Sequence, residues 1–146
     1  MQFNRPLLEN VLVSVEAFTN DSENETVAGA ALDMSGYEGV LFLAGAFQGA
    51  AVDFALKAQQ CDTSGGTYAD LEGTSLTFST AADANAYAAL DIWKPQERYV
   101  KAAVVAPHIP PAPLGAILFQ YGEQEVPVTQ SDFEDEAHES PDEGTA

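Results

Sequence analysis

The chain has 146 residues, 46% of them hydrophobic, and its 23 acidic residues against 5 basic ones give a net charge of −18. This length suits a single domain with a real core rather than two domains. So acidic a surface disfavours nucleic acids and anionic membranes, which are recognised by clustered Lys and Arg. It suits solubility, a salty habitat or a basic partner.

The first half of the chain predicts a short arm followed by strands. Residues 1–7 form the arm, because Pro6 interrupts regular structure. Alternating valines predict a strand within Leu8 to Phe18, and Thr26 to Leu32 predicts a short, weak one. Tyr37 to Ala46 is an almost continuous apolar run, which is typical of a strand buried on both faces.

Val52 to Leu71 predicts a β-hairpin around which the other strands are arranged. Apolar and polar residues alternate from Val52 to Gln59, the period of a half-buried strand. Asp62 to Gly66 then supplies a turn, and the second strand is expected to begin at Thr67.

The second half continues this pattern of short strands and turns. Further strands are predicted at Ser75 to Ser79, Tyr87 to Trp93, Arg98 to Val105 and Leu114 to Tyr121. Prolines predict a corner at Pro95 and a stiff extended loop from Ala106 to Pro113.

About eight short strands with turns between them predict a mainly β fold, an antiparallel β-sandwich, with a jelly roll as one form of it. The expected organisation is an arm (1–7), a sandwich domain (8–129) and an acidic C-terminal tail (130–146) that is solvated and contributes little to stability. Modest numbers of long aliphatic side chains suggest that association of copies completes the burial of the fold.

The chemistry-bearing residues predict no catalysis, cofactor or metal site. His108 lies in the proline loop and His138 in the acidic tail, so we expect no shared zinc site. Cys61, the only cysteine, is expected to be a buried structural thiol. Asp62 and Asp70 could offer oxygens to Ca²⁺, but aspartate is also a common turn residue. The sequence contains no phosphate loop, nucleophile elbow or dinucleotide fingerprint, and nothing in it selects a carboxylate pair for glycoside hydrolysis. We expect no secretory signal and no membrane span.

Two surface features remain open to interpretation. Tyr68, Trp93 and Tyr99 could form a sugar-binding platform, although aromatic side chains on strands more often fill the core. Lys94, Arg98 and Lys101 form the chain's one basic cluster, and pairing with nearby carboxylates is their expected fate.

Four motifs resemble a group of small structural proteins encoded in the head-gene region of tailed bacteriophages. They are DMSGYEGVLFLAGA, VDFALKAQQCDTSGGTYADLEGT, LDIWKPQERYVKAAVV and LGAILFQYGEQEVPVT, and they extend from Asp33 to Thr129. The shared order is Gly-Tyr-Glu-Gly before an apolar strand, Leu-Lys-Ala-Gln and Asp-Leu-Glu-Gly around a hairpin, Lys-Pro-x-x-Arg-Tyr-Val, and a closing Gln-Tyr-Gly with Pro-Val. The acidic tail lies outside the resemblance.

The resemblance implies a virion protein made in the host cytoplasm that decorates and cements the outer surface of a phage capsid. It further implies that the protein binds the major capsid protein and forms a homo-oligomer, with a trimer favoured. The arm and the proline loop would supply the contacts, through Phe3, Arg5, His108, Ile109, Pro110 and Pro111. The alternatives are a tail or head–tail connector protein and a carbohydrate-binding β-module.

Overall fold

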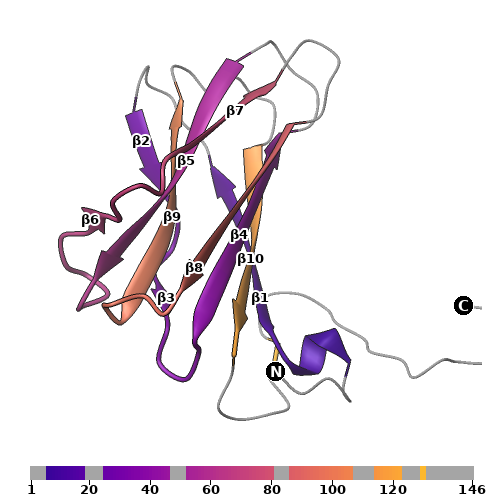
Figure 1. Cartoon of the computed structure of the whole chain (residues 1–146), viewed down its shortest axis with the longest axis vertical. Coiled ribbons are helices and arrows are strands. Elements are labelled where there is room, and N and C mark those ends of the chain that lie inside the picture. The colour runs from indigo at the N-terminus through magenta and orange to yellow at the C-terminus, as the bar shows by residue number, and fades with distance from the viewer. Residues whose placement is uncertain are drawn as a thin grey trace, which may run out of the picture.

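The computed structural model describes residues 6–18, 25–46, 52–80, 86–106, 114–122 and 129–130. In this part of the chain, two antiparallel sheets pack against each other, so the predicted β-sandwich is confirmed (Figure 1). No helix among these residues is long and apolar enough to cross a bilayer.

Ten strands and one 3-10 turn make up the described fold. In chain order they are η1 (Leu7–Glu9), β1 (Leu12–Phe18), β2 (Glu25–Ala28), β3 (Leu32–Asp33), β4 (Gly39–Ala46), β5 (Val52–Cys61), β6 (Ala69–Asp70), β7 (Leu76–Thr80), β8 (Ala86–Trp93), β9 (Tyr99–Ala106) and β10 (Leu114–Tyr121).

Each sheet joins strands that are distant in the sequence. Sheet A has the order β1-β10-β4-β8, and sheet B has the order β2-β9-β5-β6, with β3 also on β9 and β7 also on β5. Because β2 and β3 share one neighbour, they act as one interrupted edge strand, and β6 and β7 act as another on β5.

If β2 and β3 are counted as one strand, and β6 and β7 as another, the described fold has eight strands, and they pair in a nested order. The first pairs with the eighth (β1 and β10), the second with the seventh (β2/β3 and β9), the third with the sixth (β4 and β8), and the fourth with the fifth (β5 and β6/β7). The chain is therefore one long antiparallel hairpin folded over into two layers, with β10–β4 and β9–β5 pairs closing the sheets.

The core lies between the sheets and is built from alternate residues of their strands. Phe42 on β4 and Leu56 on β5 are fully buried within it, and the Phe54 and Phe78 rings stack with centroids 5.4 Å apart. Small side chains from both sheets, such as Ala44, fill the remaining space. Alanine side chains in the core let the two layers pack closely. Several large apolar side chains lie on the outside of the sandwich instead.

Several predicted elements differ in detail from the structure. Within the stretch from Leu8 to Phe18, the expected strand begins at Leu12, because residues 7–9 form the 3-10 turn. The side-chain amide of Asn10, which follows this turn, donates to the Pro6 carbonyl at 2.8 Å. The strand expected over Thr26 to Leu32 is split, because residues 29–31 between β2 and β3 are not in a strand. There the Ala30 amide donates to the Glu16 carboxylate on β1 at 3.0 Å, so a side chain takes the place of the backbone partner that a strand would supply.

The hairpin of β5 also has an interrupted second arm. It begins at Ala69 rather than at Thr67, pairs for two residues as β6, and resumes as β7 after a bulge. Inside the bulge, the Thr74 hydroxyl accepts a hydrogen bond from the Ala58 amide at 3.2 Å. The turn residues of the bulge were recognisable in the sequence, but the continuation of the same ladder beyond them was not.

Candidate functional site

Among the described residues, no three His, Cys, Asp or Glu side chains lie close enough together to hold a metal ion. Asp70, one of the two aspartates considered for Ca²⁺, accepts hydrogen bonds from Lys57 at 2.8 Å and Gln59 at 2.7 Å. These two donors hold the pKa of Asp70 below its usual value. Its carboxylate is thus committed to an ion pair on sheet B. His108 and His138 lie outside the described residues.

Cys61 is free and buried, as predicted. Its sulfur lies 4.0 Å from the Thr63 hydroxyl, and a Cβ at Gly66 would collide with both groups. Gly66 therefore closes the hairpin turn over the thiol, which explains why this turn needs a glycine at that place.

The basic cluster of the sequence is dispersed over separate partners. Arg98 donates to both carboxylate oxygens of Asp33, at 2.9 and 2.7 Å, and this contact holds the pKa of Asp33 below its usual value. Lys101 instead lies over the Tyr68 ring, 4.1 Å from its centroid, and Lys94 lies 5.4 Å from the centroid of Trp93. Pairing with a carboxylate, the fate expected for all three, holds for Arg98, while the two lysines make cation–π contacts.

The structure divides the three rings of the expected sugar platform between the two sheets. Tyr99 pairs with Cys61 in sheet B, on the side where Tyr68 lies under Lys101. Trp93 is at the end of β8 in sheet A and stacks on Tyr121, with centroids 5.9 Å apart. Trp93 and Tyr121 therefore form a stacked aromatic pair on sheet A, apart from the two rings on sheet B.

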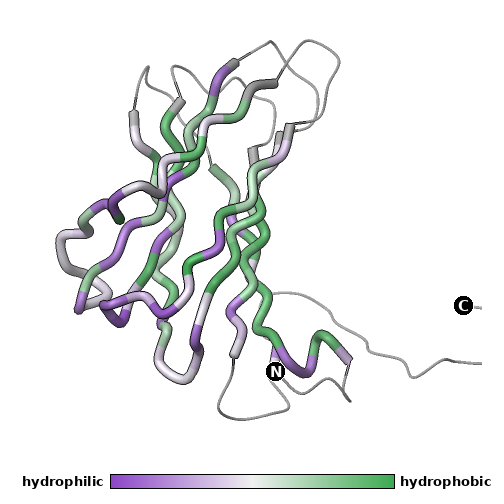
Figure 2. Tube along the Cα trace, viewed as in Figure 1, coloured by the Kyte–Doolittle hydropathy of each residue, from purple (hydrophilic) through white to green (hydrophobic). Residues whose placement is uncertain are grey.

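A further surface of interest among the described residues is the outer face of sheet A, the side turned away from the core. Along its four strands the outward positions are apolar with one exception, Asp91 on β8. We call this surface the outer apolar face; its apolar members are Val13, Val15, Ala17, Leu41, Leu43, Gly45, Tyr87, Ala89, Trp93, Gly115, Ile117 and Phe119. Figure 2 shows the strands of sheet A mostly in hydrophobic green, whereas sheet B carries more purple.

Several large side chains on this face are exposed, whereas Val13 on the edge strand β1 is buried. Val15 is 63% exposed, Tyr87 57% and Trp93 56%, and Leu43 and Ile117 are also exposed. Large contiguous apolar patches on a soluble domain mark places where another molecule binds.

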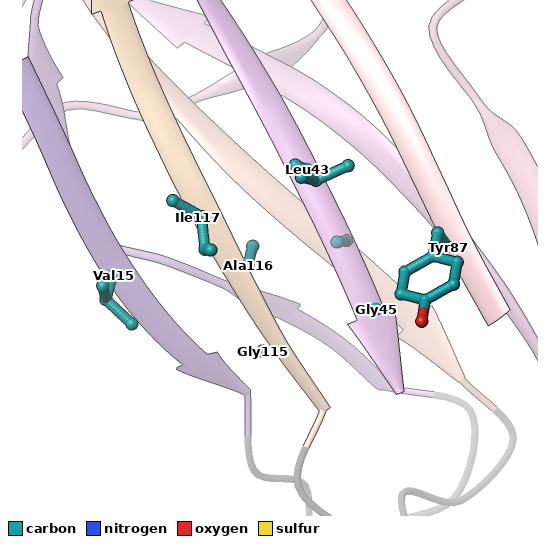
Figure 3. A pocket seen from close by; sticks show the side chains of 8 residues that line it. Val15, Leu43, Gly45, Tyr87, Gly115, Ala116 and Ile117 are labelled. Carbon is teal, nitrogen blue, oxygen red and sulfur yellow. The ribbon is translucent and has the colours of Figure 1, made fainter. Parts of the chain in front are cut away.

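A shallow hollow lies within the outer apolar face. Gly45 and Gly115 face each other across the β4–β10 ladder and form its floor, since neither has a side chain. Val15, Leu43, Tyr87 and Ile117 stand around it and project to the same side of the sheet (Figure 3). The face therefore combines projecting side chains with an apolar depression.

One end of the face is held in place by Tyr121. A Cβ on Gly39 would lie 2.5 Å from the Tyr121 hydroxyl oxygen, so the glycine lets the ring lie across β4 toward β8. There the hydroxyl donates to the Asp91 carboxylate at 2.5 Å, and the ring stacks on Trp93. Burial of the Tyr121 hydroxyl is the main cause that raises its pKa above the usual value, and the hydrogen bond to Asp91 is the second cause. The Asp91 carboxylate on this face is thus engaged in a hydrogen bond.

The outer apolar face was not predicted from the sequence, although a signal for it is present there. The apolar run from Tyr37 to Ala46 predicts a strand buried on both faces, yet β4 is fully buried along its inner face only, and Leu43 is exposed on the other. The residues proposed instead as contacts, Phe3, Arg5, His108, Ile109, Pro110 and Pro111, lie outside the described residues. No family model, curated protein or solved structure matches the chain.

Proposed function

We propose that this chain is a non-enzymatic structural protein of a phage virion, which decorates the outer surface of the capsid and cements its subunits. The observation that carries the proposal is the outer apolar face of sheet A. It is a broad, mainly apolar surface suited to assembly. Such a surface suits association with another molecule.

The nested strand pairing supports the same proposal. We assign the order first–eighth–third–sixth in sheet A and second–seventh–fourth–fifth in sheet B to a jelly roll. Jelly rolls are two-layered folds that recur in viral capsid and lectin domains, among other proteins. Fold alone does not fix function, so this support is added to the resemblance of the four sequence motifs and does not replace it.

Charge and chain layout suit a protein on the outside of a shell. A net charge of −18 on each copy would keep decorated particles from adhering to one another. The arm (1–7) and the proline loop, with the contact residues proposed above, would reach the major capsid protein and order on binding. The chain would act as a homo-oligomer, for which the resemblance favours a trimer.

A carbohydrate-binding module is the second candidate, and one observation favours it. Trp93 is more than half exposed and stacks on Tyr121 beside the Asp91 carboxylate, an arrangement that could hold a sugar ring. Binding to a glycan array that disappears in Trp93→Ala, with Tyr68→Ala as the control on sheet B, would support this candidate.

Quantitative mass spectrometry of purified virions tests the decoration proposal. A decoration protein is present in many copies, in a fixed ratio to the major capsid protein, and is accessible to protease on intact particles. A tail or connector protein is present as one ring at a single position and has a much lower ratio. Absence of the chain from virions would contradict both virion functions.

A further inference from the structure

The outer apolar face has the chemistry of a surface that meets an uncharged, apolar partner. Among the described residues its strands carry one outward charged side chain, Asp91, which is hydrogen-bonded to Tyr121, and the Lys94 ammonium lies at one end of the face, 5.4 Å from the centroid of Trp93. The outer side of sheet B differs, because Lys57 pairs with Asp70 there at 2.8 Å and Lys101 lies over Tyr68. The two outer faces of the sandwich therefore serve different purposes, and only the face of sheet A is suited to being covered.

We propose that the outer apolar face is where two copies of this chain meet, sheet A against sheet A. The proposal deepens the proposed function, since it takes the face as an assembly surface and names a second copy as the molecule that covers it. It leaves contact with the capsid to other parts of the chain.

Charge is the first reason to choose a second copy. The chain carries −18, so a basic partner would be recognised by placing carboxylates at the contact, and this face offers no free one. Two copies of so acidic a chain repel each other, and they can approach most closely through a surface that carries little charge. The outer apolar face is such a surface among the described residues.

Shape is the second reason. The hollow over Gly45 and Gly115 lies next to the projecting side chains of Tyr87, Leu43 and Ile117 on the same face (Figure 3). A two-fold axis places the same patch on both partners, so side chains that project from one copy can enter the hollow of the other. Because the face carries both projecting side chains and a hollow, it can pack against a second copy of itself.

Area is the third reason. Four strands about 4.8 Å apart and about eight residues long present a face of roughly 500 Å². Two facing copies would therefore bury on the order of 1,000 Å², which reaches the lower limit for a specific interface. Pairing would also bury β4 on both sides, as the apolar sequence of this strand predicts.

The proposal differs from the trimer that the resemblance favours. A ring of three joins two unlike patches on each copy, whereas a patch that pairs with itself gives a dimer. The expected mass in solution is therefore about 31 kDa, for two chains of 15.5 kDa each.

Sedimentation equilibrium of the full chain, with variants at Ile117, tests the proposal. Ile117 is 41% exposed in the middle of the face, so Ile117→Glu should leave the fold intact by circular dichroism and shift the mass to that of one chain. Ile117→Lys should do the same. Thr77→Glu, which adds the same charge to the outer side of sheet B, should leave the dimer unchanged.

Mixing the two Ile117 variants provides the decisive result. If two copies meet face to face, Glu on one copy lies near Lys on the other, and the mixture should form dimers that neither variant forms alone. A monomeric wild-type chain, a trimer, or a dimer that survives Ile117→Glu would overturn the proposal. If either Ile117 variant fails to fold, Leu43→Glu and Leu43→Lys provide the same test on the neighbouring strand.

The result is independent of the decoration function. A monomeric chain that still binds capsid shells would contradict only the face-to-face pairing. A dimer that dissociates in Ile117→Glu but never binds shells would contradict only the decoration function.

Discussion

Gln130 forms a contact at the edge of sheet A that allows a quantitative prediction. Its side-chain amide donates to the Leu8 and Val11 carbonyls at 2.8 and 2.7 Å and accepts from the Val13 amide at 3.0 Å. The Val11 carbonyl and the Val13 amide lie on either side of Leu12, on an edge strand that pairs only with β10. The Gln130 amide thus takes the place of a peptide group from a neighbouring strand and closes this edge.

Replacing Gln130 by Ala should lower the free energy of unfolding by about 2 kcal/mol. Three hydrogen bonds are lost, each with a net value of about 1 kcal/mol, and their backbone partners are only partly buried. Water can therefore reach some of these partners and recover part of the loss. The same loss is expected for a chain that ends at Thr129, whereas a chain that ends after residue 131 should keep wild-type stability. This revises the expectation that the whole segment 130–146 contributes little.

Urea unfolding, followed by circular dichroism, measures the difference at an unchanged slope. Gln130→Glu is a matched variant, because it keeps the acceptor for Val13 but turns a carboxylate oxygen toward the two carbonyls. Repulsion should raise the folded-state pKa of the introduced carboxyl above its unfolded value, so this variant should regain stability as the pH falls through that raised pKa. Wild-type stability for Gln130→Ala would refute the reasoning, because it would mean that water closes the edge equally well.

Three further substitutions test other parts of the account. Gly39→Ala should displace the Tyr121 ring from Trp93 and destabilise the fold by about 1–3 kcal/mol, with a changed near-ultraviolet dichroism spectrum; an unchanged spectrum would contradict the close packing. Lys94→Gly should raise the free energy of unfolding by up to about 1 kcal/mol, because the φ of Lys94 is +51° and Gly adopts this conformation without strain. A lower free energy of unfolding would show that the contact of Lys94 with Trp93 matters more. Arg98→Met should remove a contribution of the Arg98–Asp33 pair to the free energy of unfolding. This contribution is present above the unfolded pKa of Asp33 and is lost as the pH falls through the lower folded pKa. The free energies of unfolding of wild type and variant should therefore converge in acid, and a difference that persists there would point to lost packing.

The alternation of apolar residues was sufficient to predict the two-layer β fold. Strands β4, β5, β8, β9 and β10 lie close to their predicted places, because each has a long periodic or apolar pattern bounded by turn residues. The interrupted edge strands were harder to predict. Their interruptions are accompanied by bonds to side chains, such as that from the Ala30 amide to Glu16 between β2 and β3, which no local pattern encodes.

The candidate surface was only partly predictable. The apolar run through Leu43 indicates that both sides of β4 are to be buried, but register across the sheet decides that Val15, Ile117 and Tyr87 join it on one face. Much of that register depends on pairs that are distant in the sequence. The contact from Gln130 to β1 joins residues 117 or more positions apart and could not be predicted from local spacing.

Co-sedimentation with capsid shells that lack this protein tests the central claim most directly. The proposal places the gene in a phage genome, so the shells come from that phage, and the purified full chain is titrated against them. The account predicts saturable binding, at a copy number fixed by the symmetry of the shell, that stabilises the shell against heat. No binding to mature shells at concentrations well above that of the capsid sites would contradict the decoration function.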